Sequence, residues 1–356
     1  MIDNDLKPDS RSNIEGGVDM RFLKNRLGLD VTYFNYTDGP QIFNKVLSQA
    51  TGYNNLILNA VKTRKQGLEV SVNGTAVRTR SGFSWDVLAN WSMFREKYLE
   101  LPQGVTKLYD FYEAGDRVDK IYIQSFAKTP DGQIINDDGG RPIRLPTNQF
   151  YGYGDADWSC GLNNRFTYKG FNLSFQFDGR IGGAMENYIR RQTFRGGRHI
   201  ETIQGALGAA RYQDYKGVKS YIGEGVVVSN NVPIEFDPVT GAITNYKDLQ
   251  FTPNTIATFA QDYISRYNST SEGNMMSKTY VKLRKTTLTY NIPAQIFGSN
   301  FIKSASVSLV GRNLLYFVKD KRNKDVDIDQ YAGRGSSSGL QTPTTKRYGI
   351  NLNITF

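Results

Sequence analysis

Acidic side chains that could hold a metal ion occur in two short stretches of the chain. Asp325, Asp327 and Asp329 alternate in DVDIDQ, and NDDGG at residues 136–140 offers further carboxylate and amide oxygens. Calcium requires six to eight oxygen ligands, and neither stretch has the spacing of an EF-hand loop. We therefore predict no resident cofactor or metal, with Asp325, Asp327 and Asp329 as the candidates for a loop-bound Ca²⁺. The alternative is a solvated turn, because Asp, Asn and Gly favour turns.

The residue types that most often build catalytic and zinc sites are nearly absent. The chain of 356 residues contains one histidine, His199, and one cysteine, Cys160. A single cysteine excludes an intramolecular disulfide and a cysteine metal cluster, and a single histidine excludes the usual histidine-based zinc and triad arrangements. Asp and Glu are plentiful, but none forms a recognisable paired-acid motif. We predict that the chain is not an enzyme.

Arginine and aromatic side chains gather in NYIRRQTFRGGRHIETIQ, residues 187–204. The candidate binding residues here are Tyr188, Arg190, Arg191, Phe194, Arg195 and Arg198. Because arginine and aromatic residues dominate interface hot spots, this segment could pair with acidic cargo or grip a partner protein. The alternative is a rim that is solvated or that faces lipopolysaccharide.

A second aromatic group, Tyr109, Phe111 and Tyr112, lies in a long connection further upstream. These rings could stack on sugars, since binding residues are often carried on loops that a rigid scaffold positions. They could equally pack the loop onto itself.

The elements that must position these residues are strands with one apolar and one polar face. In FNLSFQFDGR (171–180), Phe171, Leu173, Phe175 and Phe177 alternate with polar residues, and this period of two is the signal of a half-exposed strand. The segments with this pattern are residues 17–23, 26–36, 66–76, 83–94, 158–168, 171–180, 279–292, 301–317 and 346–356. The chain is therefore predicted to be all-β, with nine antiparallel strands.

The connections between these strands alternate between short and long. The short ones are LKNR, TRSG, YKG and PAQIFGSN, and the long ones lie near residues 37–65, 95–157, 181–278 and 318–345. Short turns on one side and long loops on the other are typical of a transmembrane β-barrel with extracellular loops. No run of about 18 apolar residues predicts a transmembrane helix. The prediction is a barrel in the bacterial outer membrane, with 1–356 forming one part of it.

The polar strand faces would line a wet lumen, and the apolar faces would meet outer-membrane lipid. Aromatic residues that could form the interfacial girdles are Tyr33, Trp85, Trp91, Tyr168 and Tyr348. The alternative is a soluble or cell-surface β-rich carbohydrate-binding protein, in which the apolar faces would pack against each other. The net charge of +10 is scattered rather than gathered in one stripe, so we predict no nucleic-acid partner.

The number of predicted strands is odd, whereas bacterial single-chain barrels have an even number. An open sheet edge cannot face lipid, and no signal peptide is visible in MIDNDLKPDSRSN. Either one strand is miscounted, or the chain is the C-terminal part of a larger barrel, without its plug domain and N-terminal strands. We favour the second interpretation, in which strands from the rest of the protein complete the wall.

Several motifs in order resemble the C-terminal portion of SusC/RagA-like TonB-dependent outer-membrane transporters of Bacteroidota. They are NDLKPDSRSNIEGGVDMRFLKNRL (4–27), TGYNNLILNAVKTRKQGLEVSV (51–72), DADWSCGLNNRFTYKGFNLSFQFDGRIGG (155–183), YVKLRKTTLTYNIP (280–293), SLVGRNLLYF (308–317) and KRYGINLNITF (346–356). The resemblance is weakest in residues 181–278. Val61 stands where this family often has Gly, and Val326 stands where it often has Pro.

The resemblance implies a plugged barrel of about twenty-two strands. It further implies TonB-dependent import of glycan oligomers or peptides, with a SusD-like surface lipoprotein as the lid and with TonB contacted through the N-terminal part. The ending RYGINLNITF resembles the signal read by the barrel-assembly machinery. Its residues are Tyr348, Ile350, Leu352, Ile354 and Phe356.

Overall fold

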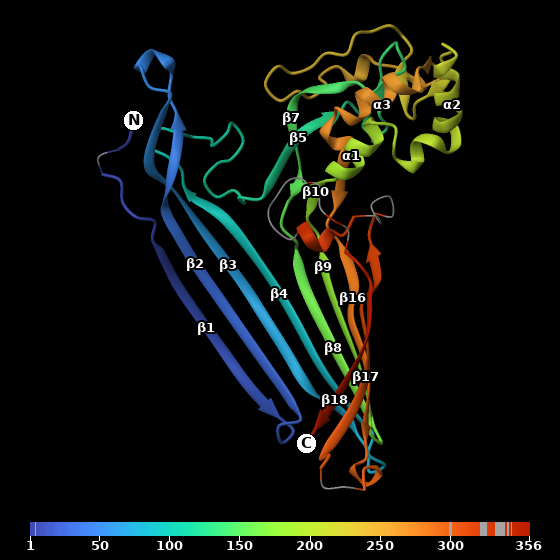
Figure 1. Ribbon diagram of the computed structural model, residues 1–356. Coiled ribbons are helices and arrows are strands. Elements are labelled where there is room, and N and C mark those ends of the chain that lie inside the picture. Colours follow the sequence, from blue (N-terminus) through green and yellow to red (C-terminus); the bar gives the residue numbers. More distant parts are fainter. Residues whose placement is uncertain (4, 299–300, 321–325, 332–338, 340–341, 343) are drawn as a thin grey trace.

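A single antiparallel sheet of nine strands forms the frame of the molecule (Figure 1). The computed structural model describes all residues except 4, 299–300, 321–325, 332–338, 340–341 and 343. The strands of the sheet, in spatial order, are β1 (Arg11–Phe22), β2 (Leu27–Val46), β3 (Asn55–Arg78), β4 (Ser84–Glu100), β8 (Trp158–Tyr168), β9 (Phe171–Ile181), β16 (Tyr280–Ile292), β17 (Ser304–Val318) and β18 (Arg347–Thr355). The predicted number of strands is confirmed.

The strands are longer than the sequence pattern predicts. We expected a loop near residues 37–65, but β2 continues to Val46 and β3 begins at Asn55, and Val46 pairs with Asn55. That part of the prediction is wrong. At this end of the hairpin polar and apolar residues no longer alternate strictly, so the period of two fades while the backbone ladder continues. The prediction that the connection near residues 95–157 starts at residue 95 is wrong for the same reason, because β4 runs to Glu100.

The two faces of the sheet differ in character, as the alternation predicts. Leu288 on β16 lies opposite Leu173 on β9 and Leu309 on β17, and Leu309 lies opposite Ile350 on β18. Leu309 is 52% exposed and Ile350 is 77% exposed. Within the described residues no second sheet covers this apolar face, so it does not form the packed core that a soluble β-sandwich requires.

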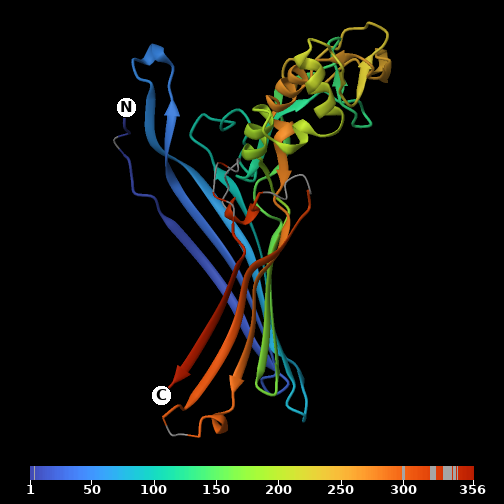
Figure 2. The ribbon, with the colours of Figure 1, turned by 45° about the vertical axis from the view of Figure 1, so that its right-hand side comes forward.

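The opposite face carries polar side chains and is hollowed. Thr289 and Ser308 share a hydrogen bond of 2.8 Å across β16 and β17, and Ser92 and Ser159 share one of 2.9 Å across β4 and β8. A hollow of about 350 Å³ on this face is lined by polar residues that include Arg165. The sheet is twisted and curved (Figure 2), and in the described residues β1 and β18 each pair with one neighbour only.

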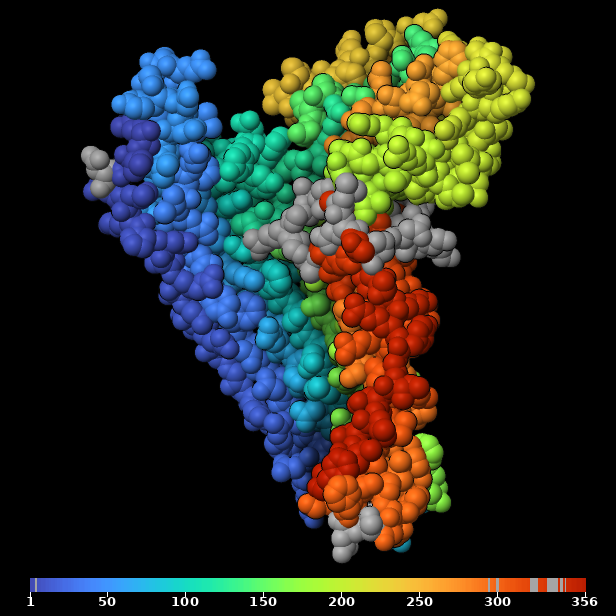
Figure 3. Space-filling view, viewed as in Figure 1, coloured from blue at the N-terminus to red at the C-terminus, as the bar shows by residue number. Residues whose placement is uncertain are grey.

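The long connections gather at one end of the sheet and the short ones at the other (Figure 1). The two longest connections, residues 101–157 and 182–279, pack together into a compact unit that we call the crown. Figure 3 shows the crown projecting over β8, β9 and β16, while the tip of the β2–β3 hairpin stands apart on the other side. The prediction placed long connections here but did not include the helices within them.

The crown contains short strands and all three α-helices of the described residues. Its elements are β5 (Lys120–Phe126), β6 (Ile135–Asn136), β7 (Arg144–Tyr153), β10 (Ala184–Glu186), α1 (Tyr188–Arg195), η2 (Ile200–Ile203), α2 (Gly205–Tyr215), β11 (Tyr221–Ile222), β12 (Val226–Val228), η3 (Tyr246–Asp248), β13 (Phe251–Pro253), β14 (Ala257–Thr258), α3 (Ala260–Asn268), η4 (Ser271–Asn274) and β15 (Met275–Ser277). Other short helical turns are η1 (Gln49–Thr51), η5 (Ala294–Ile296) and η7 (Ile328–Tyr331). Among the described residues, no helix has the length and apolar character needed to cross a membrane.

The core of the crown is built from both connections. Ala127 and Ile135 from the first connection pack with Val226, Ile243 and Leu249 from the second, and all five are buried. Parallel pairing of β6 with β12 fixes the two connections to each other. Burial of apolar side chains contributes roughly 25 cal/mol per Å², so this shared core holds the crown together as one unit.

A buried polar cluster links the two connections of the crown close to the points where they lead into β8 and β16. Arg117 donates to both oxygens of Asp119, at 2.8 and 2.6 Å, and the backbone N–H of Asp155 donates to the same carboxylate at 2.9 Å. Burial alone would raise the pKa of Asp119, but these hydrogen bonds and the charge of Arg117 outweigh it and lower that pKa. Close by, the fully buried Lys278 donates to the carbonyl of Gly154 at 2.9 Å.

Candidate binding site

The crown contains an open cavity of about 420 Å³ between α1, α3 and the segment that precedes α2. Two of the predicted binding residues, Arg190 and Phe194, line it from α1. Tyr263 and Tyr267 line it from α3. Ligand cavities combine apolar or aromatic walls with a few fixed polar groups, and this cavity has both.

Aromatic rings form one wall of the crown cavity. The ring centroids of Tyr221 and Tyr263 are 4.8 Å apart in an edge-to-face arrangement, and Tyr263 and Tyr267 are stacked at 6.0 Å. Tyr263 is only 8% exposed, and burial raises the pKa of its hydroxyl. Tyr263 therefore stays neutral over the physiological range, and aromatic rings of this kind suit sugar rings or apolar and planar peptide side chains.

The polar side of the cavity centres on Arg190. Its Nη2 donates to Glu201 at 2.8 Å, and its guanidinium carbon lies 4.6 Å from the centroid of the Phe194 ring. The Nε of Arg190 is buried and has no acceptor among the described residues. A buried N–H without a partner is costly, so a shift of the Arg190 side chain toward an acceptor group in the cavity would relieve this cost.

The other predicted residues of this segment lie outside the cavity. Arg191 pairs with Glu186 and lies over the ring of Tyr188, with its guanidinium carbon 5.2 Å from the centroid. Arg195 and Arg198 are exposed. The sequence group therefore divides into a part that lines the cavity, a part that fixes the start of α1, and an exposed part. No observation assigns a ligand to any of them, so their binding role stays a prediction.

The three predicted aromatic residues of the first connection lie in two different environments. The ring of Phe111 stacks on Tyr122 at 4.7 Å, and Tyr112 packs edge-on against Tyr122 at 5.8 Å. The hydroxyl of Tyr112 donates to the carbonyl of Lys120 at 2.9 Å. Tyr109 is 67% exposed. Phe111 and Tyr112 thus pack the connection onto itself, whereas the ring of Tyr109 lies 6.2 Å from that of Phe43 on β2 and stays largely exposed.

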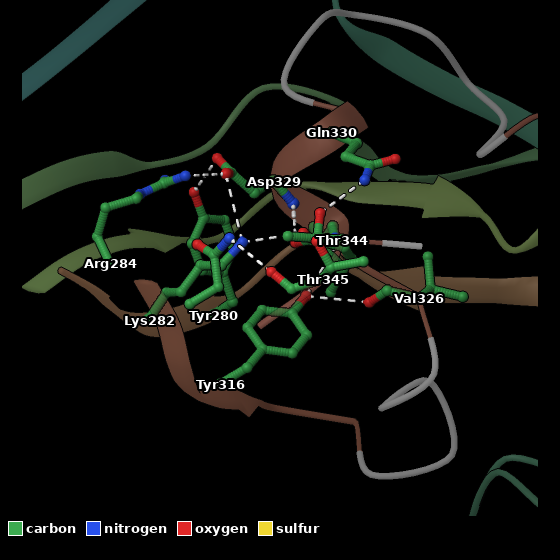
Figure 4. Close-up of polar contacts among 12 residues, drawn as sticks. Tyr280, Lys282, Arg284, Tyr316, Val326, Asp329, Gln330, Thr344 and Thr345 are labelled. Atoms are coloured by element: carbon green, nitrogen blue, oxygen red, sulfur yellow. Dashed lines mark hydrogen bonds and ion pairs between the residues drawn. The ribbon is translucent and has the colours of Figure 1, made fainter. Parts of the chain in front are cut away.

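A second polar site lies on the polar face of the sheet, which we call the inner wall. Here η7 packs against β16 and β17 (Figure 4). Arg284 Nε donates to Asp178 at 2.7 Å, and its Nη1 lies 2.5 Å from Asp329. Lys282 lies 2.9 Å from Asp327 and 3.7 Å from Asp329. The Lys282 and Asp327 side chains are only 3% and 10% exposed. These five residues form what we call the anchor network.

Tyrosines complete the anchor. Tyr280 donates to Asp329 at 2.8 Å, and Tyr316 donates to the carbonyl of Val326 at 3.1 Å and accepts from the backbone N–H of Ile328 at 2.8 Å (Figure 4). Burial alone would raise the pKa of Asp329, but its hydrogen bonds from Arg284 and Tyr280 lower it. The network holds the segment 326–331 against the wall.

Two of the three calcium candidates, Asp327 and Asp329, belong to this network. Asp327 and Asp329 are compensated by basic side chains, and Asp325 lies outside the described residues. In the NDDGG stretch, Asp137 accepts from the backbone N–H groups of Gly139 and Arg141, which is the geometry of a turn. No cluster of three or more possible metal ligands occurs in the part of the chain that the structure describes. A calcium site stays an untested prediction.

The chain was compared with protein families and with curated proteins. No protein-family model matches the chain. It is 19% identical to TonB-dependent receptor P3 of Formosa agariphila over 99% of its length, and 23% identical to TonB-dependent receptor P39 of the same organism over 96%. The curated relatives of this chain are TonB-dependent receptors. The chain spans about a third of their length, 33% and 35% respectively.

Solved structures agree on the fold of a TonB-dependent barrel fragment. The RagAB peptide transporter superposes with a TM-score of 0.64 at 19% identity, over 98% of this chain and 35% of that one. The open-open state of the RagAB peptide importer gives 0.66 at 17% identity, over 99% and 35%. The resemblance predicted from the motifs is confirmed. At this identity the likeness shows the fold.

The predicted assembly residues lie on or directly after β18. Tyr348, Ile350, Leu352 and Ile354 share its apolar face, and the ring of Phe356 lies 5.0 Å from that of Phe301. Tyr348 and Ile350 are each 77% exposed. Their arrangement matches the predicted alternation, and their role in assembly stays a prediction.

The sequence interpretation missed Tyr221, Tyr263 and Tyr267 in the crown cavity. A signal was present for two of them, because Tyr263 and Tyr267 are four residues apart in AQDYISRYN and would share one face of a helix. Tyr221 has no comparable local signal, since it reaches the cavity only through the pairing of β11 with β14. The sequence interpretation also missed Lys282 and Arg284. The turn of η7 places the predicted Asp327 and Asp329 beside these two basic residues.

Proposed function

We propose that this chain forms part of the barrel wall and the extracellular crown of a TonB-dependent importer in the bacterial outer membrane. The observation that carries the proposal is the two-faced sheet. In the described residues it has nine strands, an apolar face without a second sheet over it, a polar hollowed face, and long connections at one end only. Lipid would cover the apolar face, and the polar face would line the lumen. The receptor names of the relatives support the same assignment.

We propose glycan oligomers or peptides as the cargo class and the crown as a place of capture. The crown cavity offers stacked tyrosines for sugar rings or side chains, and Arg190 for carbonyl or carboxylate oxygens. A SusD-like surface lipoprotein would close over the crown as a lid, and TonB would act through parts of the protein outside this chain. The peptide transporter named among the structural neighbours supports a cargo of this size class.

A growth experiment tests the function. A strain that lacks the gene would be grown on defined oligosaccharides or oligopeptides as the sole carbon source. It would then be complemented with full-length wild-type protein, with Arg190→Ala, or with the exposed control Arg195→Ala. We expect slower growth of the deletion strain on at least one oligomer, restored by the wild type and the control but less well by Arg190→Ala.

Two outcomes would reject the proposal. In the first, the deletion strain grows like the parent on every oligomer tested. In the second, the protein partitions into the aqueous phase without detergent. The second result would favour the soluble carbohydrate-binding alternative, in which the apolar faces are buried within the protein.

A further inference from the structure

Three basic side chains form a row across the inner wall, next to the anchor network. Lys285 on β16 lies directly opposite Arg312 on β17, and Arg312 lies directly opposite Arg347 on β18. Directly opposite residues on one face of a sheet have their Cβ atoms about 5 Å apart. Three positive charges are therefore direct neighbours on the polar face, and we call them the basic row.

The charges of the basic row have no counter-ion within the described residues. None of the three forms an ion pair there, whereas the adjacent Arg284 is held by Asp178 and Asp329. The chain that leads into β18, residues 330–346, contains no Asp or Glu at all. Like charges placed directly opposite each other destabilise a sheet, so this arrangement is unfavourable unless an anion shares the space.

The basic row borders a cavity that could hold such an anion. The cavity has a volume of about 720 Å³, and besides the row and Arg284 it is lined by amide and hydroxyl groups, among them Asn313, Gln330 and Thr344. Gln330 Nε2 donates to Thr344 Oγ1 at 2.6 Å, which orders the rim (Figure 4). No carboxylate of the described residues lines the cavity. Its lining therefore consists of cations and neutral groups that can donate hydrogen bonds.

We propose that the basic row binds the carboxylates of a multiply acidic oligomer within the lumen. Arginine forks match carboxylate geometry, and charge-assisted hydrogen bonds are stronger than neutral ones. The spacing of the three cations along one line suits successive carboxylates of an acidic peptide or of a uronic-acid glycan. This inference rests on the proposed function, because it makes the row a contact for cargo that has passed the crown.

Equilibrium binding of defined probes to the full-length protein in detergent tests the proposal. The acidic probes are tetraglutamate and tetragalacturonate, and their matched neutral probes are tetraglutamine and a galactose tetramer. We expect one or both acidic probes to bind in preference to the neutral ones, and the probe that binds identifies the source of the carboxylates. Binding should weaken as salt is added, because the row is open to solvent.

Neutralising the row provides the specific test. Lys285→Gln, Arg312→Gln and Arg347→Gln should each weaken binding of the acidic probe about tenfold, and the triple variant by about 100-fold or more. Arg21→Gln is the control, since Arg21 lies on the same face of the sheet but on β1, where it pairs with Asp19 at 2.9 Å. Loss of like-charge repulsion should leave the triple variant folded, and an unchanged thermal melting curve would establish this.

The outcomes separate this inference from the proposed function. If neither acidic probe binds the wild type, or if the triple variant binds as tightly as the wild type, the inference is overturned even where growth shows that import continues. If growth on every oligomer is unaffected by deletion of the gene, the proposed function fails, whatever the probes do. Binding that is lost in the triple variant and kept in Arg21→Gln supports the inference.

Discussion

Replacing Arg284 by methionine should release the segment 326–331 from the inner wall. Methionine keeps an apolar stem of similar length but removes the guanidinium that joins Asp178 on β9 to Asp329 on η7. The two carboxylates would then lose the cation that they share, and Asp329 would keep the Tyr280 hydroxyl at 2.8 Å and Lys282 at 3.7 Å. The cost should appear as more frequent opening of this segment, because the remaining sheet does not depend on the pair.

The size of the effect follows from the burial of the pair. Hydrogen bonds to charged groups contribute about 1.5–3 kcal/mol when well formed, and exposed ion pairs contribute about 0–1 kcal/mol. The Arg284 and Asp329 side chains are 34% and 23% exposed, which lies between these cases. A loss of about 2 kcal/mol is therefore expected, and it corresponds to about a 30-fold larger open population.

Amide hydrogen exchange of the full-length protein in detergent measures this opening. The N–H of Ile328, which donates to the Tyr316 hydroxyl in the closed segment, should exchange about 30-fold faster in Arg284→Met. Arg165→Met, on the same polar face, serves as the control and should leave the exchange of Ile328 unchanged. An acceleration below about threefold in Arg284→Met would refute the view that this ion pair holds the segment.

Three further predictions concern the crown and the end of the chain. In Gly223→Ala the new methyl group would lie 2.1 Å from the Tyr263 ring, so we expect a loss of about 1–3 kcal/mol in crown stability, seen as faster limited proteolysis of the crown. The pKa of Asp119 is lowered from its ordinary value of 3.8. The ionised carboxylate therefore stabilises the fold fully above pH 3.8, and this stabilisation is lost as the pH falls below 3.8. The melting temperature of Asp119→Asn should depend less on pH in this acid range than that of the wild type. Phe356→Ser should reduce the amount of folded protein recovered from outer membranes, whereas Thr355→Ser should not, and equal recovery would contradict an assembly role for the terminal aromatic residue.

The frame of the fold could be predicted because the two faces of the sheet differ in polarity. Phe171, Leu173, Phe175 and Phe177 alternate with polar residues, since each strand has one face toward the polar hollow and one apolar face left uncovered. The ends of the strands were predicted less accurately than their centres. Residues 37–46 lack that strict alternation, so the pattern disappears although the backbone pairing continues.

The crown could not be predicted in the same way because contacts distant in sequence create it. Ile135 pairs with Val226 across 91 positions, and no local period marks either residue as part of a shared core. The candidate site was found in part: Arg190 and Phe194 stand out by composition, but only the fold brings Tyr263 beside them. The bulge between Leu283 and Lys285 likewise breaks the alternation of β16, so the sequence alone does not show that Arg284 reaches Asp178.

The central claim is that one face of the sheet meets lipid and the other meets the lumen. Nitroxide labels placed singly at Ser308 and Leu309, in full-length protein in membranes with Cys160 replaced by Ala, test it directly. Our account predicts that the label at position 309 is more accessible to oxygen dissolved in lipid, and that the label at position 308 is more accessible to a water-soluble nickel chelate. Equal accessibility of the two positions to both reagents would contradict it.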